Sequence, residues 1–303
     1  MDIIEKIRLF KRVAEKKSFS SVAKEHNMTQ PTISKAVASL EKQLAVPLFR
    51  RSTRGLSLTV EGQKLLHSSK VTLDQYDTMI ASVRSEKLQL TGQMKVGASL
   101  AFARIVLAPL MPQFVKENPG LSLHFQLSDG FVDLIENNID VAIRIGDLAD
   151  SSLKGFRVGL SRRALYANQD YIKNHSQPKS IIDLNEHRLL FFNRIADRPS
   201  WPLINKEGGR INFNFTPFMQ SDGSDLIREA VLKGLGIALL PTWTMVEEEK
   251  NKIVRRLIQP EITTPSPIYV LHAGTELSIK QKVFIDFLRT HLDKIKELSL
   301  RGD

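Results

Sequence analysis

Residues 29–43 read TQPTISKAVASLEKQ, and this stretch decides the first part of the fold. Thr29 is a suitable helix N-cap, and Pro31 stands in the first turn, where its missing backbone N–H costs nothing. A predicted buried stripe is formed by apolar residues at helical spacing, which are Ile33, Val37, Leu40 and Leu44. We therefore expect a helix from about Gln30 to Gln43 whose other face is polar.

Two shorter helices are predicted upstream of this stretch. The first has apolar positions at helical spacing, which are Ile3, Ile7, Phe10, Val13 and Ala14. Ser20 is the expected N-cap of the second helix, and Asn27 tolerates the left-handed backbone of the turn that follows. A short turn thus joins the helix capped by Ser20 to the helix that starts at Gln30, and the latter has short polar and basic side chains at its start. Insertion into the major groove of DNA requires such a pair of helices.

A basic hairpin is predicted downstream. Residues 46–49 form a strand-like entry, residues 50–55 a tip with three arginines beside a glycine, and residues 56–58 a second strand. Such a tip suits phosphate or minor-groove contact, and the alternative is an exposed basic loop on an unrelated helical domain. The candidate DNA contacts are Ser20, Gln30, Pro31, Thr32, Ser34, Lys35, Arg50, Arg51, Thr53 and Arg54.

The charge distribution points to the same end of the chain. Residues 1–66 hold 13 Lys and Arg against 6 Asp and Glu, whereas the other 237 residues hold 30 against 27. This asymmetry favours a polyanion-binding module on a nearly neutral body, although a basic solvated face would look alike.

The 303-residue chain is long enough for two or three domains. It has no cysteine, which excludes disulfides, thiol nucleophiles and thiolate metal sites. We find no apolar run of membrane-spanning length and no signal peptide, and so expect a soluble, cytoplasmic protein without a membrane partner.

A long helix is predicted from Thr59, because only Gly62 and no proline interrupts residues 59–91. Its apolar positions alternate by threes and fours in the manner of a coiled-coil seam, with Leu66, Leu73, Tyr76, Ile80 and Val83 as candidate dimerisation residues. Packing of this stripe on its own domain is the alternative, but a reader of pseudo-palindromic DNA needs a twofold partner. Residues 87–93 would be a hinge.

Beyond Gly92, strands alternate with helices, which implies an α/β fold with a mostly parallel sheet. Strands are predicted at 93–98, 121–127, 140–145, 237–240 and 268–272, with helices at 101–118 (broken around Pro109 and Pro112), 131–136, 224–233 and 278–298. Ligands collect beyond the carboxyl ends of such strands. Serines, one arginine and the helix start at 222–224 lie there and favour a small anion.

The N-terminal residues resemble those of the LysR-type transcriptional regulators. The matching residues are 19–24 (FSSVAK), 29–37 (TQPTISKAV), Leu40-Glu41, 48–51 (LFRR) and 58–62 (LTVEG). The resemblance implies that Gln30, Pro31, Ser34 and Lys35 face DNA and that Arg54 is the wing residue. Lys35 stands where many relatives carry Arg or Gln.

The resemblance also implies the rest of the architecture. We expect a winged helix-turn-helix at 1–58, a linker helix and hinge at 59–92, and at 93–303 a two-lobed α/β sensor domain similar to type 2 periplasmic binding proteins. Lobe I would be 93–162 and 268–303, lobe II 163–267, with crossovers near 161–166 and 263–268. Candidate contacts to an unknown small-molecule effector are Ser99, Phe102, Ser128, Arg144, Gly146, Phe192, Asn193, Phe218, Gly223 and Ser224.

Double-stranded operator DNA and a second copy of the chain, in a dimer or tetramer, are the expected partners, and RNA polymerase is left open. No cofactor, metal or enzymatic activity is expected, because the sequence has no His-Glu-x-x-His, dinucleotide loop, phosphate loop or nucleophile elbow. Two other functions are weighed. A solute-binding module would use only the second half, and a DNA-compacting protein would bind without sequence preference.

Overall fold

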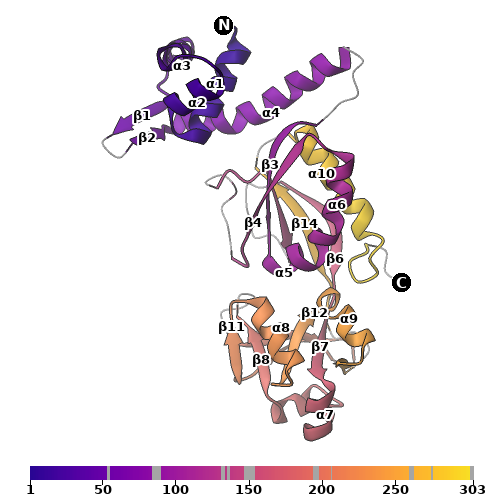
Figure 1. The fold of residues 1–303 in the computed structure, drawn as a ribbon. Coiled ribbons are helices and arrows are strands. Elements are labelled where there is room, and N and C mark those ends of the chain that lie inside the picture. The colour runs from indigo at the N-terminus through magenta and orange to yellow at the C-terminus, as the bar shows by residue number, and fades with distance from the viewer. Residues whose placement is uncertain are drawn as a thin grey trace. The chain divides into compact units, whose positions relative to one another are not determined.

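A computed structural model describes residues 1–52, 55–83, 90–130, 134, 137–146, 154–193, 198–205, 207–258, 263–273 and 276–300. The chain divides into two compact units, Met1–Leu90 with Gly274–Lys282, and Thr91–Ala273 with Val283–Asp303. Figure 1 shows the fold and labels most of the helices and strands of both units.

Three helices open the N-terminal unit: α1 (Ile3–Lys16), α2 (Phe19–Glu25) and α3 (Gln30–Leu44). The predicted start of α3 is confirmed, because the Thr29 side chain accepts a hydrogen bond from the Thr32 backbone N–H and Pro31 occupies the first turn. The predicted N-cap of α2 was wrong. Ser18 precedes the helix in extended backbone and its hydroxyl accepts from the Ser21 N–H at 3.2 Å, so Ser20 lies inside the helix.

The helices pack around an aromatic centre. The Phe49 ring lies 5.4 Å from that of Phe10 and 5.7 Å from that of Phe19. Fully buried side chains around these rings come from α1, α2, α3 and the loop that follows, and include Leu9, Val13, Val22, Ile33, Val37, Leu40 and Leu48. Leu44 is 41% exposed, so the predicted stripe of α3 ends at Leu40.

The hairpin consists of β1 (Phe49–Ser52) and β2 (Gly55–Leu58), paired antiparallel with Phe49 opposite Leu58. It begins later than predicted, and Arg50 and Arg51 belong to β1 instead of the tip. The reason is that the chain first terminates α3 after Leu44. Ala45 takes the left-handed conformation, and the Val46 N–H donates a hydrogen bond to the Glu41 carbonyl.

The linker helix α4 (Val60–Val83) follows at once. Thr59 joins it to the hairpin region, because its buried hydroxyl accepts from the Gly62 N–H at 2.9 Å and donates to the Pro47 carbonyl at 2.7 Å. A side chain at position 62 would collide with the Leu48 carbonyl, which explains the glycine. Residues 87–89 of the predicted hinge lie outside the described residues, and Gly92 and Gln93 belong to a strand.

The second unit contains two five-stranded sheets, which we call lobe I and lobe II. Lobe I has the order β4-β3-β5-β14-β6, formed by β3 (Gly92–Ala98), β4 (Leu121–Leu127), β5 (Val141–Ile145), β6 (Lys154–Ser161) and β14 (Ser266–His272). β3 pairs parallel with β4 and β5, but β14 is antiparallel to β5 and β6. The expected mostly parallel sheet is therefore half right, because the strands next to the crossovers run antiparallel.

One long helical segment covers part of lobe I: α5 (Leu100–Phe102), the π-helical η1 (Ala103–Leu107) and α6 (Ala108–Glu117). The predicted break around Pro109 does not occur, because Pro109 sits in the first turn of α6 after the π-helical turn, and Pro112 is accommodated inside α6. Phe114 of α6 packs edge-on against Phe284 and Phe287 of α10 (Ile279–Leu292), beside which it lies in Figure 1. The helix predicted at 131–136 lies outside the described residues, apart from Leu134.

Lobe II has the order β11-β8-β12-β7-β13, formed by β7 (Arg163–Asn168), β8 (Leu189–Phe192), β11 (Met219–Ser221), β12 (Ile237–Pro241) and β13 (Val254–Leu257). A separate antiparallel hairpin joins β9 (Ser200–Ile204) to β10 (Arg210–Asn214). The helices of lobe II are α7 (Gln169–His175), η2 (Ile182–Glu186), α8 (Ser224–Leu232), η3 (Thr242–Thr244) and α9 (Val246–Lys250).

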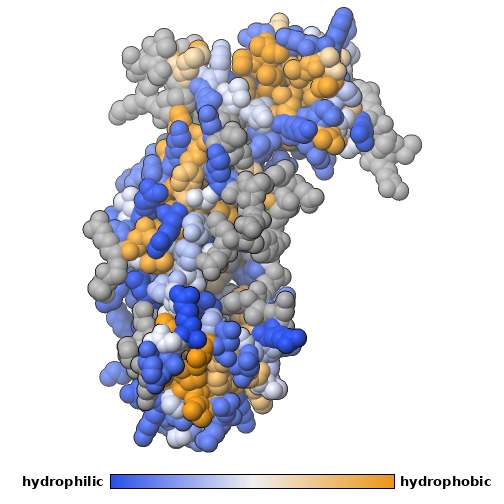
Figure 2. Space-filling model, turned by 180° about the vertical axis from the view of Figure 1, so that it is seen from behind, coloured by the Kyte–Doolittle hydropathy of each residue, from blue (hydrophilic) through white to orange (hydrophobic). Residues whose placement is uncertain are grey.

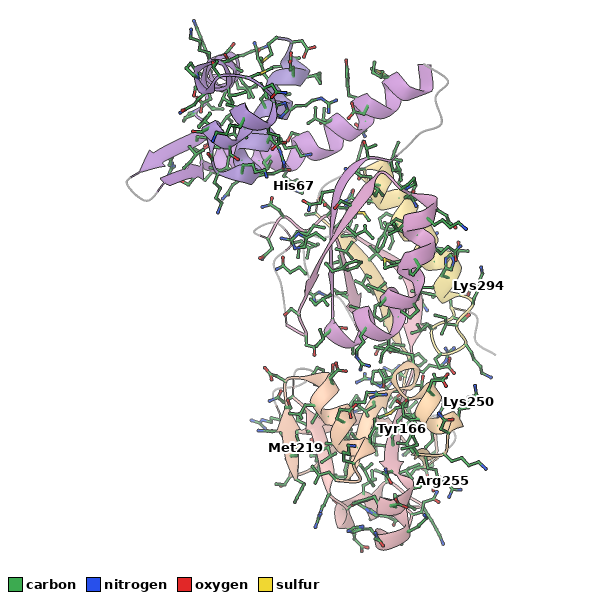
Figure 3. The ribbon with its side chains drawn as sticks, viewed as in Figure 1. His67, Tyr166, Met219, Lys250, Arg255 and Lys294 are labelled. Atoms are coloured by element: carbon green, nitrogen blue, oxygen red, sulfur yellow. The ribbon has the colours of Figure 1, made fainter. Side chains whose placement is uncertain are left out.

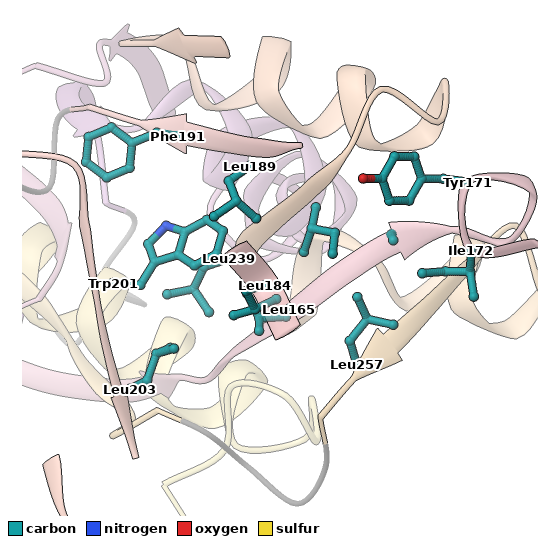
Figure 4. Close-up of a cluster of buried hydrophobic side chains, with 12 residues drawn as sticks. Leu165, Tyr171, Ile172, Leu184, Leu189, Phe191, Trp201, Leu203, Leu239 and Leu257 are labelled. Atoms are coloured by element: carbon teal, nitrogen blue, oxygen red, sulfur yellow. The ribbon is translucent and has the colours of Figure 1, made fainter. Parts of the chain in front are cut away.

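The lobe II sheet carries two apolar clusters. The first surrounds Trp201 of β9, which lies near Leu189 and Leu239 in Figure 4 and has the Phe215 ring 4.4 Å away. The second contains Tyr166, with Met219 packed against it; the two come from β7 and β11 in Figure 3. Burial raises the pKa of the Tyr166 hydroxyl, which keeps this group neutral.

The chain passes between the lobes twice. Arg162 lies between β6 of lobe I and β7 of lobe II, and residue 263 precedes the return into β14. The Thr263 hydroxyl donates to the Arg163 carbonyl at 2.9 Å and joins the two passages. The Thr242 N–H of η3 donates to the Arg162 carbonyl of the first passage at 2.9 Å.

Within the described ranges, none of the helices combines the length and the apolar character needed to span a bilayer.

Candidate DNA-binding surface and lobe junction

The first turns of α3 present the polar surface that the sequence predicted. Gln30, Pro31, Thr32 and Lys35 are exposed, and Ser34 is half-buried. The hydroxyls of Thr29 and Thr32 lie 2.8 Å apart and form a hydrogen bond with each other at the start of the helix. The remaining exposed groups are an amide, a hydroxyl and an ammonium, which suit base edges and phosphates.

Helix α2 contributes one of the candidate residues to the same surface. The exposed Ser20 hydroxyl donates to the Gln30 side-chain oxygen at 3.4 Å, although ten residues separate them. The contact uses the side-chain oxygen of Gln30 and does not occupy its amide nitrogen, which is a hydrogen-bond donor. Ser20 is therefore placed to orient the Gln30 amide.

The hairpin candidates are only partly described. Arg50 is exposed and lies opposite Ser57, and Arg51 lies opposite Leu56 in the register of β1 and β2. Thr53 and Arg54 fall outside the described residues.

Glu41 is a positioning residue that the sequence did not reveal. Its Oε1 atom accepts hydrogen bonds from the backbone N–H groups of Leu48 at 2.7 Å and Phe49 at 3.2 Å. A carboxylate near the C-terminus of a helix is unfavourable by itself, so this tie offsets a local cost. Glu41 thereby fixes the hairpin, and with it Arg50, relative to α3. Only its place in the family motif hinted at a role.

Some of the N-terminal basic residues are used inside the unit. The Arg12 guanidinium donates to both carboxylate oxygens of Glu25, at 2.6 and 2.9 Å, and to Glu15 at 2.9 Å. These bonds lower the pKa of Glu25 and raise that of Arg12. Arg8 of α1 pairs with Asp77 of α4. Fewer positive charges are therefore available to contact DNA than the net charge of the region suggests.

In lobe I the predicted strand ends do meet at one edge of the sheet. Ser99 follows β3, Ser128 follows β4 and Gly146 follows β5, and these three strands are parallel. The Ser99 hydroxyl accepts from the Phe102 N–H at 3.4 Å, so Ser99 is also the cap of α5. Arg144 is half-buried, which lowers the pKa of its guanidinium, and it donates to the Gly130 carbonyl at 3.2 Å.

Lobe II brings its own strand ends to the junction. Asn193 follows β8 and is exposed, whereas Phe192 is half-buried against the Tyr166 cluster. Gly223 and Ser224 begin α8 after β11. We define the lobe junction by four of the contacts that join the lobes directly: Asp129 with Ser224, Arg104 with Asp225, Phe102 with Trp243, and Trp243 with Ser161.

Two predicted effector contacts are placed differently from our expectation. Phe218 precedes β11, so it lies at the opposite end of the strand from Gly223, with the Arg188 guanidinium 4.9 Å above its ring. Phe102 is 1% exposed, and its ring packs edge-on against Trp243 at 5.5 Å. Phe102 is thus a packing residue between the lobes, and we omit Phe218 from the proposed site.

The candidate dimer seam splits into two groups. Leu66 is buried in the N-terminal core and Leu73 is 3% exposed within the single chain, so both are already covered by their own chain. Tyr76 and Ile80 are half-buried, and Met79 between them in the helix is 53% exposed; nothing is described for the Val83 side chain. Figure 2 shows apolar residues gathered over the N-terminal unit on the face drawn.

No group of three or more His, Asp or Glu side chains suited to a metal ion occurs among the described residues.

Comparison with known proteins agrees with this architecture. Residues 4–63 match the family described as "Bacterial regulatory helix-turn-helix protein, lysR family", and residues 87–293 match the "LysR substrate binding domain". The chain is 28% identical over 290 residues to the HTH-type transcriptional regulator CrgA of Neisseria meningitidis serogroup C (strain 8013), covering 94% of this chain and 95% of CrgA. It is 29% identical over 296 residues to the HTH-type transcriptional regulator DmlR of Escherichia coli (strain K12), covering 96% of this chain and 95% of DmlR.

Solved structures of similar fold cover nearly the whole chain. The structure of CrgA, described as a LysR-type transcriptional regulator from Neisseria meningitidis, has a TM-score of 0.61 with 26% identity and covers 94% of this chain and 97% of its own. Full-length AphB, a Vibrio cholerae virulence activator, has a TM-score of 0.59 with 25% identity and covers 96% and 100%.

Proposed function

The chain belongs to the LysR family of bacterial transcriptional regulators, and from that premise we propose that it reads a pseudo-palindromic operator as a dimer or tetramer and responds to a small anionic effector. That it is a DNA-binding regulator with a substrate-binding domain follows from the family. The observation that carries the proposal is the start of α3, where Thr29 caps the helix and Gln30, Thr32 and Lys35 stand exposed.

DNA reading is divided between two elements. Gln30 is suited to a bidentate pair with adenine and Lys35 to guanine or phosphate, so the first turns of α3 supply base discrimination. Arg50, with Arg51, Thr53 and Arg54, supplies contacts to the backbone or minor groove, which strengthen binding to any sequence.

Pairing of chains is proposed to use α4. Tyr76 and Ile80 remain from the predicted seam, and the exposed Met79 adjoins them. Two recognition helices related by a twofold axis read two half-sites about one helical turn, or a multiple of it, apart. A tetramer would pair two such dimers.

The effector is proposed to bind at the lobe junction. Arg144, the half-buried Ser99 and Ser128 hydroxyls, and the start of α8 at Gly223 and Ser224 offer positive charge and donors. A half-buried guanidinium favours an anion nearby, because the anion offsets the cost of its desolvation. We further propose a cytoplasmic location and contact with RNA polymerase as the route from operator binding to transcription.

The experiment that tests this function is fluorescence anisotropy of the full chain on DNA fragments selected by the protein from a random library. We expect recovered sequences with two related half-sites, and a midpoint that moves when small carboxylates are screened. Affinity without sequence preference would favour a DNA-compacting protein. Carboxylate binding with no affinity for any DNA would favour a solute-binding module.

A further inference from the structure

Asp129 accepts three hydrogen bonds, two of which join the lobes. It follows Ser128 at the end of β4 in lobe I, and its Oδ1 atom accepts from the Leu100 N–H at 3.1 Å. Its Oδ2 atom accepts from both the N–H and the hydroxyl of Ser224, at 3.2 and 3.1 Å. One carboxylate thus takes donors from the first residue of α5 in lobe I and the first residue of α8 in lobe II.

Two further polar contacts between the lobes differ from this one. Arg104 and Asp225 form an ion pair at 2.8 Å, but their side chains are 51% and 30% exposed, so water competes with it. Trp243 donates to the buried Ser161 hydroxyl at 2.9 Å beside the first crossover, where the chain already joins the lobes. Asp129 differs because its carboxylate accepts hydrogen bonds at the starts of two helices, α5 and α8.

We propose that Asp129 is an internal latch: its carboxylate holds lobe I to lobe II in the absence of effector, and an effector carboxylate acts by replacing it on the same donors. This inference rests on the proposed function for its use of an effector. The latch itself does not depend on DNA.

The chemistry favours replacement over simple addition. Leu100 and Ser224 together offer three hydrogens, and Asp129 accepts all three with its two oxygens. A second carboxylate at the same donors would meet the like charge of Asp129 within a few ångströms, which is strongly unfavourable. A carboxylate from an effector presents the same two oxygens without the tether to β4, so exchange frees the loop after β4.

Distances between spin labels on the full chain test the latch. The chain has no cysteine, so Lys116→Cys on α6 and Lys233→Cys after α8, both exposed, place one label on each lobe. Labelled chain is mixed with an excess of unlabelled chain, so that only distances within one chain are measured. Without effector or DNA, we expect one narrow distance for the otherwise unchanged chain and a second, longer population for Asp129→Ala. Asp170→Asn, which removes an exposed carboxylate of α7 that pairs with Lys173, is the charge-matched control and should keep the single distance.

Formate is the probe for replacement. We expect formate, against chloride at equal ionic strength, to restore the short distance in Asp129→Ala with saturation. The formate concentration that gives half of the effect should be about tenfold lower for Asp129→Ala than for the chain that keeps Asp129. In the latter chain Asp129 competes for the same donors, and the apparent affinity for formate falls with the fraction of time that Asp129 occupies them. Ser224→Ala in the same background should weaken this rescue.

The outcomes separate the parts of the proposal. An unchanged distance distribution in Asp129→Ala would overturn the latch, and opening without formate rescue would overturn the replacement. If Asp129→Ala loses its cooperative melting transition, Asp129→Asn takes its place, since it keeps the volume but presents only one acceptor oxygen. Loss of DNA binding would overturn the proposed function without touching these distances.

Discussion

Replacing Glu41 with alanine should loosen the hairpin from α3 without unfolding the helices. Glu41 Oε1 accepts from the N–H groups of Leu48 and Phe49, and Leu48 is fully buried, so its N–H would be left without this acceptor. A hydrogen bond to a charged group contributes about 1.5 to 3 kcal/mol, and an unsatisfied buried N–H costs about 1 to 3 kcal/mol. Since Phe49 is only half-buried, we expect a total of about 2 to 3 kcal/mol.

Hydrogen exchange of the full chain measures this cost at the amides concerned. A loss of about 2 to 3 kcal/mol in local opening corresponds to about 30- to 150-fold faster exchange at Leu48 and Phe49. Exchange in the middle of α1 should change far less. Glu41→Gln keeps an oxygen acceptor and loses only the charge, so its effect should be smaller.

The same variant should weaken DNA binding on all sequences, because Arg50 follows the loosened segment directly. Unchanged exchange at Leu48 and Phe49 in Glu41→Ala would refute the assignment of these hydrogen bonds. Normal exchange in α1 combined with unchanged DNA affinity would refute the claim that Glu41 positions the hairpin.

Three further predictions follow from the structure, and a fourth, on Arg54, follows from the sequence. Gln30→Ala should weaken binding to a selected operator by about 1 to 3 kcal/mol and barely change binding to random DNA, as measured by anisotropy; equal losses would rule out base reading. Arg54→Ala should lower affinity for every sequence and reduce the slope of log affinity against log salt by about one, and an unchanged slope would remove this residue from the interface. Ile80→Lys should shift sedimentation toward the monomer, whereas Leu73→Ala, at a position buried in its own chain, should chiefly lower the melting temperature; the reverse pattern would refute the seam. Burial and the neighbouring His175 keep the pKa of His187 below its ordinary 6.5, so the unfolded chain binds the proton first and stability should fall as pH drops below about 6.5; His187→Gln should remove this part of the slope in denaturant titrations at pH 7 and pH 5.5.

The N-terminal fold could be predicted from sequence because its signals are local. Thr29, Pro31 and the apolar spacing of α3 set the helix without reference to distant residues. The first strand was placed too early because apolar residues 46–48 look like a strand. Their backbone groups are instead taken by the end of α3 and by the Glu41 side chain, a contact that spacing alone does not reveal.

The candidate effector site was predicted in its parts but not in its connections. Parallel strand order placed Ser99, Ser128 and Gly146 at one edge, and the structure agrees. Asp129 directly follows the predicted contact Ser128, yet its bridge to Ser224 spans 95 residues and depends on how two lobes meet. Phe218 was misplaced because an aromatic residue near a strand gives no sign of which strand end it occupies.

Genome-wide mapping of the bound sites of the full chain tests the central claim most directly. We expect discrete sites with two half-sites whose centres are about 10 base pairs, or a multiple of that spacing, apart, and loss of these sites in the Gln30→Ala variant. Binding spread along the genome without a shared sequence, or the same discrete sites in the Gln30→Ala variant, would contradict the account of α3 as the reading helix.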